Sequence, residues 1–85
     1  MTKRNYNGRY EHVTYVAEKQ NVNKVWIPIQ AYGRPIEYST PEGVEERIKG
    51  YRRYKFSSPK IPKKYRISKI TRITTYHTTV IKEPL

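Results

Sequence analysis

The sequence predicts an α+β fold, a small twisted antiparallel sheet of three to four strands with one helix packed on a face, in the order β-β-(β)-α-β. The aliphatic residues are mostly β-branched, with nine Ile and six Val against a single Leu, and nine Tyr accompany them. One helix start is clearly marked, and a long C-terminal run of strand-forming residues contains neither Gly nor Pro. The 85 residues allow one small domain.

The N-terminal residues 1–9 are basic and contain no apolar run, so we expect a flexible basic tail before a single domain over residues 10–85. Residues 10–17 form the first predicted strand, in which neither face is purely polar. The chain has no Cys and no stretch near the roughly eighteen apolar residues of a membrane span. We therefore expect a cytoplasmic protein with no membrane partner.

Residues 25–31 show the clearest strand pattern, because every second residue from Val25 to Ala31 is apolar. Pro28 lies within this strand and has no N–H to donate, so the strand is expected at a sheet edge or with a bulge. Residues 32–35 read as a turn, and residues 36–38 as a short returning strand.

A helix is predicted to begin after Ser39, which we assign as the N-cap with Glu42 completing a capping box. Val44, Ile48 and Tyr51 follow at helical spacing and form one buried stripe. Acidic residues near the start of the helix and basic residues near its end complement the helix dipole.

Residues 65–81 are too long for one ordinary strand. Fully extended they would reach about 55 Å, whereas a domain of this size has a radius of gyration near 12 Å. The segment must bend, bulge, fold back or project. Its apolar residues change faces, which favours a bulge near Ser68 and Lys69 and a bent or protruding strand anchored by Ile67 and Ile73.

The net charge of +11 is concentrated in one block. Residues 47–72 contain eleven bases and no acid, while the rest of the chain is neutral on balance. Such a segregated positive field is what a polyanion or an acidic protein surface would experience.

Aromatic residues are interleaved with this basic block, a combination suited to neutralising phosphates and stacking on unpaired bases of single-stranded DNA or RNA. The alternative is that Tyr51 and Phe56 belong to the core and that the bases form a solvated face. We expect the basic half of residues 65–81 to form one surface with the end of the helix. The predicted binding residues are Arg47, Arg52, Arg53, Tyr54, Lys55, Phe56, Lys60, Lys63, Lys64, Arg66, Lys69 and Arg72.

Trp26 and Tyr32 are candidate anchors for a protein partner, because exposed aromatic residues beside a sheet edge suit that role. The alternative is that Trp26 covers the second face of a thin sheet. His12 and His77 are the only histidines, and without Cys or Asp they make a poor set of metal ligands. They show no diagnostic catalytic spacing, so we expect no metal, no cofactor and no enzymatic activity.

The chain is small, has no Cys, carries the run Lys-Tyr-Arg-Ile-Ser-Lys-Ile-Thr at residues 64–71, and has a Thr-rich C-terminal part. In these features it resembles the small early, or host-takeover, proteins of tailed bacteriophages. This resemblance implies a protein that acts in the host-cell cytoplasm by binding and disabling host machinery such as RNA polymerase.

Two functional interpretations follow. The first is a non-catalytic module that binds DNA or RNA through the surface of residues 47–72. The second is a takeover inhibitor that binds an acidic surface of a nucleic-acid-processing complex, by strand addition at residues 65–81 or at the Pro28 strand.

Overall fold

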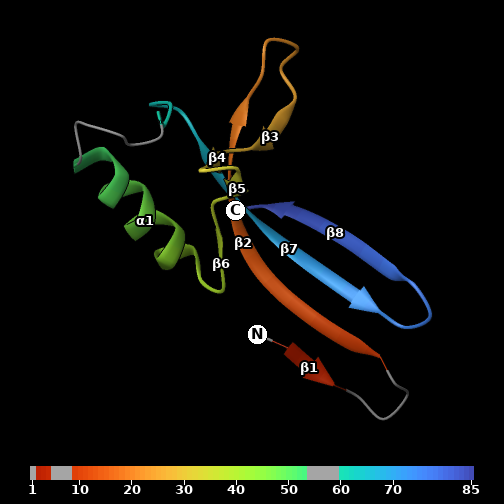
Figure 1. Cartoon of the computed structure of the whole chain (residues 1–85). Coiled ribbons are helices and arrows are strands. Elements are labelled where there is room, and N and C mark those ends of the chain that lie inside the picture. The colour runs from red at the N-terminus through yellow and green to blue at the C-terminus, as the bar shows by residue number, and fades with distance from the viewer. Residues whose placement is uncertain (1, 5–8, 54–59) are drawn as a thin grey trace.

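An antiparallel sheet with one helix makes up the computed structural model, which describes residues 2–4, 9–53 and 60–85 (Figure 1). The α+β prediction is confirmed at this level. The strands are β1 (Thr2–Arg4), β2 (Tyr10–Gln20), β3 (Trp26–Pro28), β4 (Gln30–Ala31), β5 (Arg34–Pro35), β6 (Glu37–Tyr38), β7 (Arg66–Thr74) and β8 (Thr78–Pro84), and the helix is α1 (Pro41–Arg53). No helix within the described ranges has the length and apolar character needed to cross a membrane.

Strand β2 is the centre of the sheet. The continuous strand order is β1-β2-β7-β8, and the short strands β3 and β6 also pair with β2. β1 lies within the segment expected to be a basic tail, and sequence reasoning did not predict this strand. In Figure 1 the helix lies beside β6, away from the hairpin β7–β8.

β2 and β7 pair without a break from Tyr10↔Thr74 to Glu18↔Arg66. The predicted bulge near Ser68 and Lys69 is therefore wrong. The apolar residues of β7 change faces because both faces of this strand are partly covered, with Ile67 packed against the core and Ile70 buried on the other face.

The long C-terminal segment folds back on itself. β7 and β8 form a hairpin whose turn comprises residues 75–77, and the backbone N–H of Thr75 donates to the carbonyl of His77 at 3.2 Å. The predicted order had one strand after the helix, and the structure has two. All residues of β8 are exposed, so this strand contributes little to the core.

The predicted strand over residues 25–31 is divided into β3 and β4 at Ile29. Pro28 ends β3, and β2 is the single partner of β3 among the described residues, which agrees with an edge position for Pro28. Ile29 then turns inward, where its N–H donates to Ala17 and its carbonyl accepts from Ile36. Ile29 and Ala31 are buried as predicted, whereas Val25 is 54% exposed.

Helix α1 begins one residue later than predicted. The hydroxyl of Thr40, and not that of Ser39, accepts a hydrogen bond from the N–H of Gly43 at 3.0 Å. Thr40 as the N-cap places Pro41 at the first helical position, where its missing N–H has no intrahelical partner. Glu42 then occupies the second helical position, so no capping box forms. The predicted stripe is confirmed, with Val44 and Ile48 fully buried and Tyr51 half-buried.

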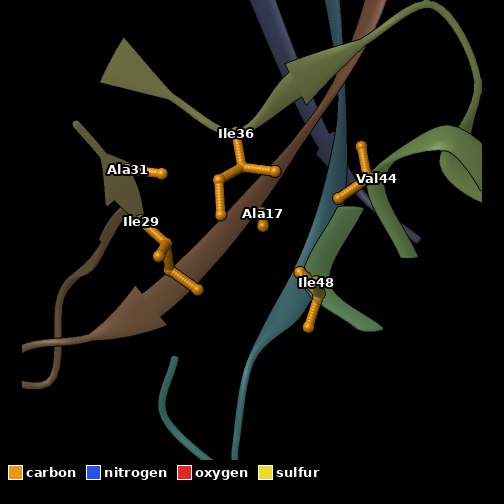
Figure 2. Packing of buried hydrophobic residues seen from close by; sticks show 6 residues of the cluster. All are labelled: Ala17, Ile29, Ala31, Ile36, Val44 and Ile48. Atoms are coloured by element: carbon orange, nitrogen blue, oxygen red, sulfur yellow. The ribbon is translucent and has the colours of Figure 1, made fainter. Parts of the chain in front are cut away.

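A small apolar core joins α1 to one face of the sheet. Figure 2 shows its six buried side chains converging from β2, from residues 29–36 and from α1. Tyr15, Tyr65 and Ile67 pack around this cluster. We call the face of β2 and β7 that carries Tyr15, Ala17 and Ile67 the helix face. The core residues are Ala17, Ile29, Ala31, Ile36, Val44 and Ile48.

Candidate nucleic-acid interface

The opposite face of β2 and β7, which carries Glu18, Ser68 and Arg72, is here called the ion-paired face. Glu18 is 1% exposed, and each oxygen of its carboxylate has a cationic partner. Arg66 Nε lies 3.0 Å from one oxygen, Lys82 Nζ lies 2.8 Å from the other, and the Ser68 hydroxyl also donates to Glu18. These contacts join β2, β7 and β8, and they satisfy a carboxylate that would otherwise be buried at high cost.

A second ion pair joins β6 to the same face. Arg72 Nη1 lies 2.7 Å from Glu37 Oε2, and the hydroxyl of Thr14 hydrogen-bonds to both side chains. Glu37 pairs in register with Val16, whose side chain shares the face of Thr14 and Glu18. Arg72 therefore has a structural partner and does not present an isolated charge.

The pKa values of both carboxyl groups are lowered. Burial by itself raises the pKa of Glu18, but hydrogen bonds from Lys82, Ser68 and Arg66 outweigh that effect. Burial likewise raises the pKa of Glu37, and hydrogen bonds from Arg72 and Thr14 reverse the direction. Both groups are therefore more acidic in the folded protein than in the unfolded chain.

The cations on the helix side of the molecule have a different environment. Within the described part of the chain, no carboxylate lies within 4.0 Å of Arg47, Arg52, Arg53, Lys60, Lys63 or Lys64, all of which are exposed. Lys49 on α1 and Arg34 on β5 share this property. Tyr54, Lys55 and Phe56, which were also predicted to bind, lie outside the described residues. We call the set Arg52, Arg53, Lys60, Lys63 and Lys64 the cationic surface.

Part of the cationic surface borders an aromatic cleft of 590 Å³ lined by Gln20, Trp26, Pro62, Lys64 and Tyr65, here called the Trp26 cleft. The Arg52 guanidinium lies 5.5 Å from the Tyr65 ring centroid and donates to the Pro62 carbonyl at 2.9 Å. The Arg66 guanidinium lies 4.4 Å from the Trp26 ring centroid. These cation–π contacts hold both guanidinium groups beside the cleft.

The predicted single surface is thus divided. Arg52, Lys64 and Arg66 meet around the Trp26 cleft, although Arg66 also pairs with Glu18. Arg72 lies six residues further along β7, about 20 Å away, on the face opposite the helix. Lys69 lies on the helix face, in register between Tyr15 and Glu83. Neither Arg72 nor Lys69 belongs to the cationic surface.

A second aromatic cleft, of 340 Å³, lies between the hairpin β4–β5 and α1, and we call it the tyrosine cleft. Tyr32, Tyr38 and Tyr51 line it together with Arg34 and Arg47. Sequence reasoning had assigned Tyr32 to a protein anchor, Tyr51 to the helix stripe and Arg47 to the basic block. These side chains come together because the hairpin β4–β5 lies next to α1. The spacing of residues in the sequence does not predict this contact.

Tyr32 occupies an unusual backbone conformation at the tip of this hairpin. Ala31 pairs with Arg34, so Tyr32 and Gly33 form a two-residue loop, and their φ angles are 54° and 79°. Two central residues with positive φ define a type I′ turn, in which Asn-Gly is the favoured pair. A bulky side chain in the left-handed region costs about 1–2 kcal/mol. The turn nevertheless holds a tyrosine that is 73% exposed.

Comparisons with known proteins give no relative: no protein-family description matches the chain, and neither characterised proteins nor solved structures provide a match. Among residues 2–4, 9–53 and 60–85, no three His, Asp or Glu side chains are grouped so that they could hold a metal ion.

Proposed function

We propose that the protein binds nucleic acid through the cationic surface and the adjoining Trp26 cleft. The observation that carries this proposal is the separation of charge environments: among the described residues, the exposed cations of the cationic surface have no carboxylate partner, and two of them, Arg52 and Lys64, lie at an aromatic cleft. Cations in this state attract phosphates, and the half-buried rings of Trp26 and Tyr65 at the cleft offer stacking for bases. The same cations would be of little use for binding if each were paired, as Arg72 is with Glu37.

The strength of such binding should depend steeply on salt. Each phosphate that a Lys or Arg neutralises contributes about 0.7 to the slope of log affinity against log salt for single strands, and about 0.9 for duplex DNA. A ligand that engages several members of the cationic surface therefore loses orders of magnitude in affinity between low and high salt.

The test is fluorescence anisotropy of labelled oligonucleotides at several salt concentrations, with Lys64→Gln compared with Lys69→Gln. Both substitutions remove one charge from the basic block, but only Lys64 lines the Trp26 cleft. We expect Lys64→Gln to weaken binding and to reduce the salt slope by about 0.7–0.9, and Lys69→Gln to change neither by much. Equal effects of the two variants would contradict the proposed interface.

Trp26 supplies a second readout, because it is the only tryptophan of the chain and lies in the cleft. Oligonucleotide binding at this site should change its fluorescence. Binding measured by anisotropy without any change in Trp26 emission would place the ligand elsewhere on the molecule.

One observation favours a second candidate, inhibition of a nucleic-acid-processing complex through protein contacts. β8 forms an outer strand of the sheet in the described part of the chain, and Val80, Ile81 and Leu85 are 58%, 43% and 68% exposed. An outer strand with exposed apolar side chains suits strand addition by a partner. Recovery of the same host complex with immobilised protein from lysates with and without nuclease would support this candidate over nucleic-acid binding.

A further inference from the structure

The tyrosine cleft combines three features that the proposed interface does not use. Its aromatic walls are not stacked on each other, since the Tyr32 and Tyr51 rings are 6.1 Å apart at the centroids and inclined by 65°. Its volume of 340 Å³ is at the lower end of the range for small-ligand sites, so it suits one planar group and not a large ligand. Its cations, Arg34 and Arg47, are exposed.

Arg47 is held in position by the helix residue one turn further on. Its Nε donates to the Tyr51 hydroxyl at 3.2 Å, and its guanidinium lies 5.2 Å from the Tyr51 ring centroid. The hydrogen bond to Tyr51 raises the pKa of Arg47. An arginine guanidinium is protonated in proteins in any case, so the group is charged. A fixed guanidinium beside an aromatic wall can contact an anion while a planar group occupies the cleft.

The acidic residue at this cleft does not cancel the positive charge. Glu37 is the one carboxylate among the described residues that line the cleft, and its Oε2 accepts hydrogen bonds from Arg72 and Thr14 on the ion-paired face. The cleft therefore presents tyrosine rings and two arginines to a ligand.

The strained backbone of the turn at Tyr32 also favours ligand binding at the tyrosine cleft. Asn in place of Tyr32 would suit the type I′ turn better, yet the chain keeps an aromatic residue there that is 73% exposed. Tyr32 contacts Tyr51 edge to face, and with its contacts in place the residue is still mostly exposed. An exposed residue in an unfavourable backbone conformation is typical of a functional position.

We propose that the tyrosine cleft binds one unstacked nucleobase of a single strand, while Arg34 and Arg47 contact the flanking phosphates. This inference rests on the proposed nucleic-acid binding and specifies its substrate class. Bases in a duplex are stacked and paired, so their faces cannot enter such a cleft, whereas a flexible single strand can insert one. The site therefore makes the protein prefer single strands.

The test compares Tyr32→Asn with Tyr76→Asn, using single-stranded and duplex oligonucleotides of about twelve nucleotides per strand. Tyr76 is fully exposed at the tip of the hairpin β7–β8, so its substitution is a matched control for loss of an exposed tyrosine. We expect Tyr32→Asn to weaken single-strand binding by about tenfold or more and to leave duplex binding within about twofold. Tyr76→Asn should change neither.

Further outcomes separate this inference from the proposed function. Single-strand binding that is unchanged in Tyr32→Asn would overturn the base site while the cationic surface stands. Equal losses for single strands and duplex would also overturn it. Failure of the unmodified protein to bind any oligonucleotide would overturn both. Tyr32→Phe keeps the ring and should retain single-strand affinity, and circular dichroism establishes that each variant is folded.

Discussion

The ion-paired face and the cationic surface carry the same residue types from the same basic block, but they use them differently. On the ion-paired face, Arg66 and Arg72 are held by Glu18 and Glu37. On the cationic surface, no described carboxylate is within reach of the Arg and Lys side chains. Charge density along a sequence therefore does not measure charge available for binding, because distant acids decide which bases are neutralised.

Among the variants proposed for the ion-paired face, Glu18→Ala should cause the largest loss of stability. The substitution leaves the buried Ser68 hydroxyl without its acceptor and the partly exposed Arg66 and Lys82 without their shared partner, so we expect the free energy of unfolding to fall by about 2–3 kcal/mol. Urea denaturation followed by circular dichroism measures the loss. Glu45→Ala on the exposed surface of α1 is the control and should change stability by less than about 0.5 kcal/mol. A similar small effect at Glu18 would contradict a structural role for this cluster.

Acid should weaken the ion-paired face. The folded pKa values of Glu18 and Glu37 are lowered from 4.5, so the stability they provide is present above that pH and is lost as pH falls through the folded values. Each proton taken up on unfolding changes the free energy by about 1.4 kcal/mol per pH unit. Urea titrations between neutral and acidic pH measure this slope, and Glu18→Gln should reduce it. An identical slope in Glu18→Gln would show that other groups control acid unfolding.

Arg72→Gln tests whether a member of the basic block can be purely structural. The pair with Glu37 is partly exposed, so we expect a loss of about 1 kcal/mol in the free energy of unfolding. The salt slope of oligonucleotide binding should stay unchanged, in contrast to Lys64→Gln, while single-strand affinity should fall slightly because Glu37 at the tyrosine cleft loses its cationic partner. A reduced salt slope in Arg72→Gln would show that Arg72 contacts a phosphate and belongs to the binding surface.

The smallest expected effect is a gain in thermal stability from Tyr32→Asn. Tyr32→Asn places a residue that tolerates the left-handed region in the type I′ turn, so we expect thermal stability to rise by the equivalent of about 0.5–1 kcal/mol. Thermal unfolding of Tyr32→Asn beside Tyr76→Asn measures it. Destabilisation instead would mean that the contacts of the Tyr32 side chain, including that with Tyr51, contribute more than the turn strain costs.

Local signals allowed part of the fold to be predicted from sequence. The stripe of Val44, Ile48 and Tyr51 and the edge position of Pro28 depend on spacing and backbone chemistry within a few residues. The turn at residues 75–77 was missed because Thr-Tyr-His lacks the Gly, Pro or Asn that usually marks a hairpin. The face change in β7 was read as a bulge because sequence cannot show that both faces are covered.

The candidate site was less predictable, because it depends on contacts between residues far apart in the chain. The partners Arg66 and Glu18 are separated by 48 positions, Lys82 and Glu18 by 64, and Arg72 and Glu37 by 35. Composition locates the basic block and the aromatic residues interleaved with it. Only the folded arrangement separates Lys64 at the Trp26 cleft from Lys69 beside Glu83.

The exposure of β8 has a consequence for how the sheet opens. Its side chains contribute little buried surface, and among the described residues it is held by the ladder with β7, the hydrogen bond between the Thr74 and Thr78 hydroxyls, and the ion pair from Lys82 to Glu18. Local detachment of this strand therefore requires far less free energy than global unfolding. Native-state hydrogen exchange should give the amides of β8 low protection and those of β2, which is paired along both edges, the highest. We therefore expect the central strand β2 to open only when the whole protein unfolds, and the edge strand β8 to open on its own.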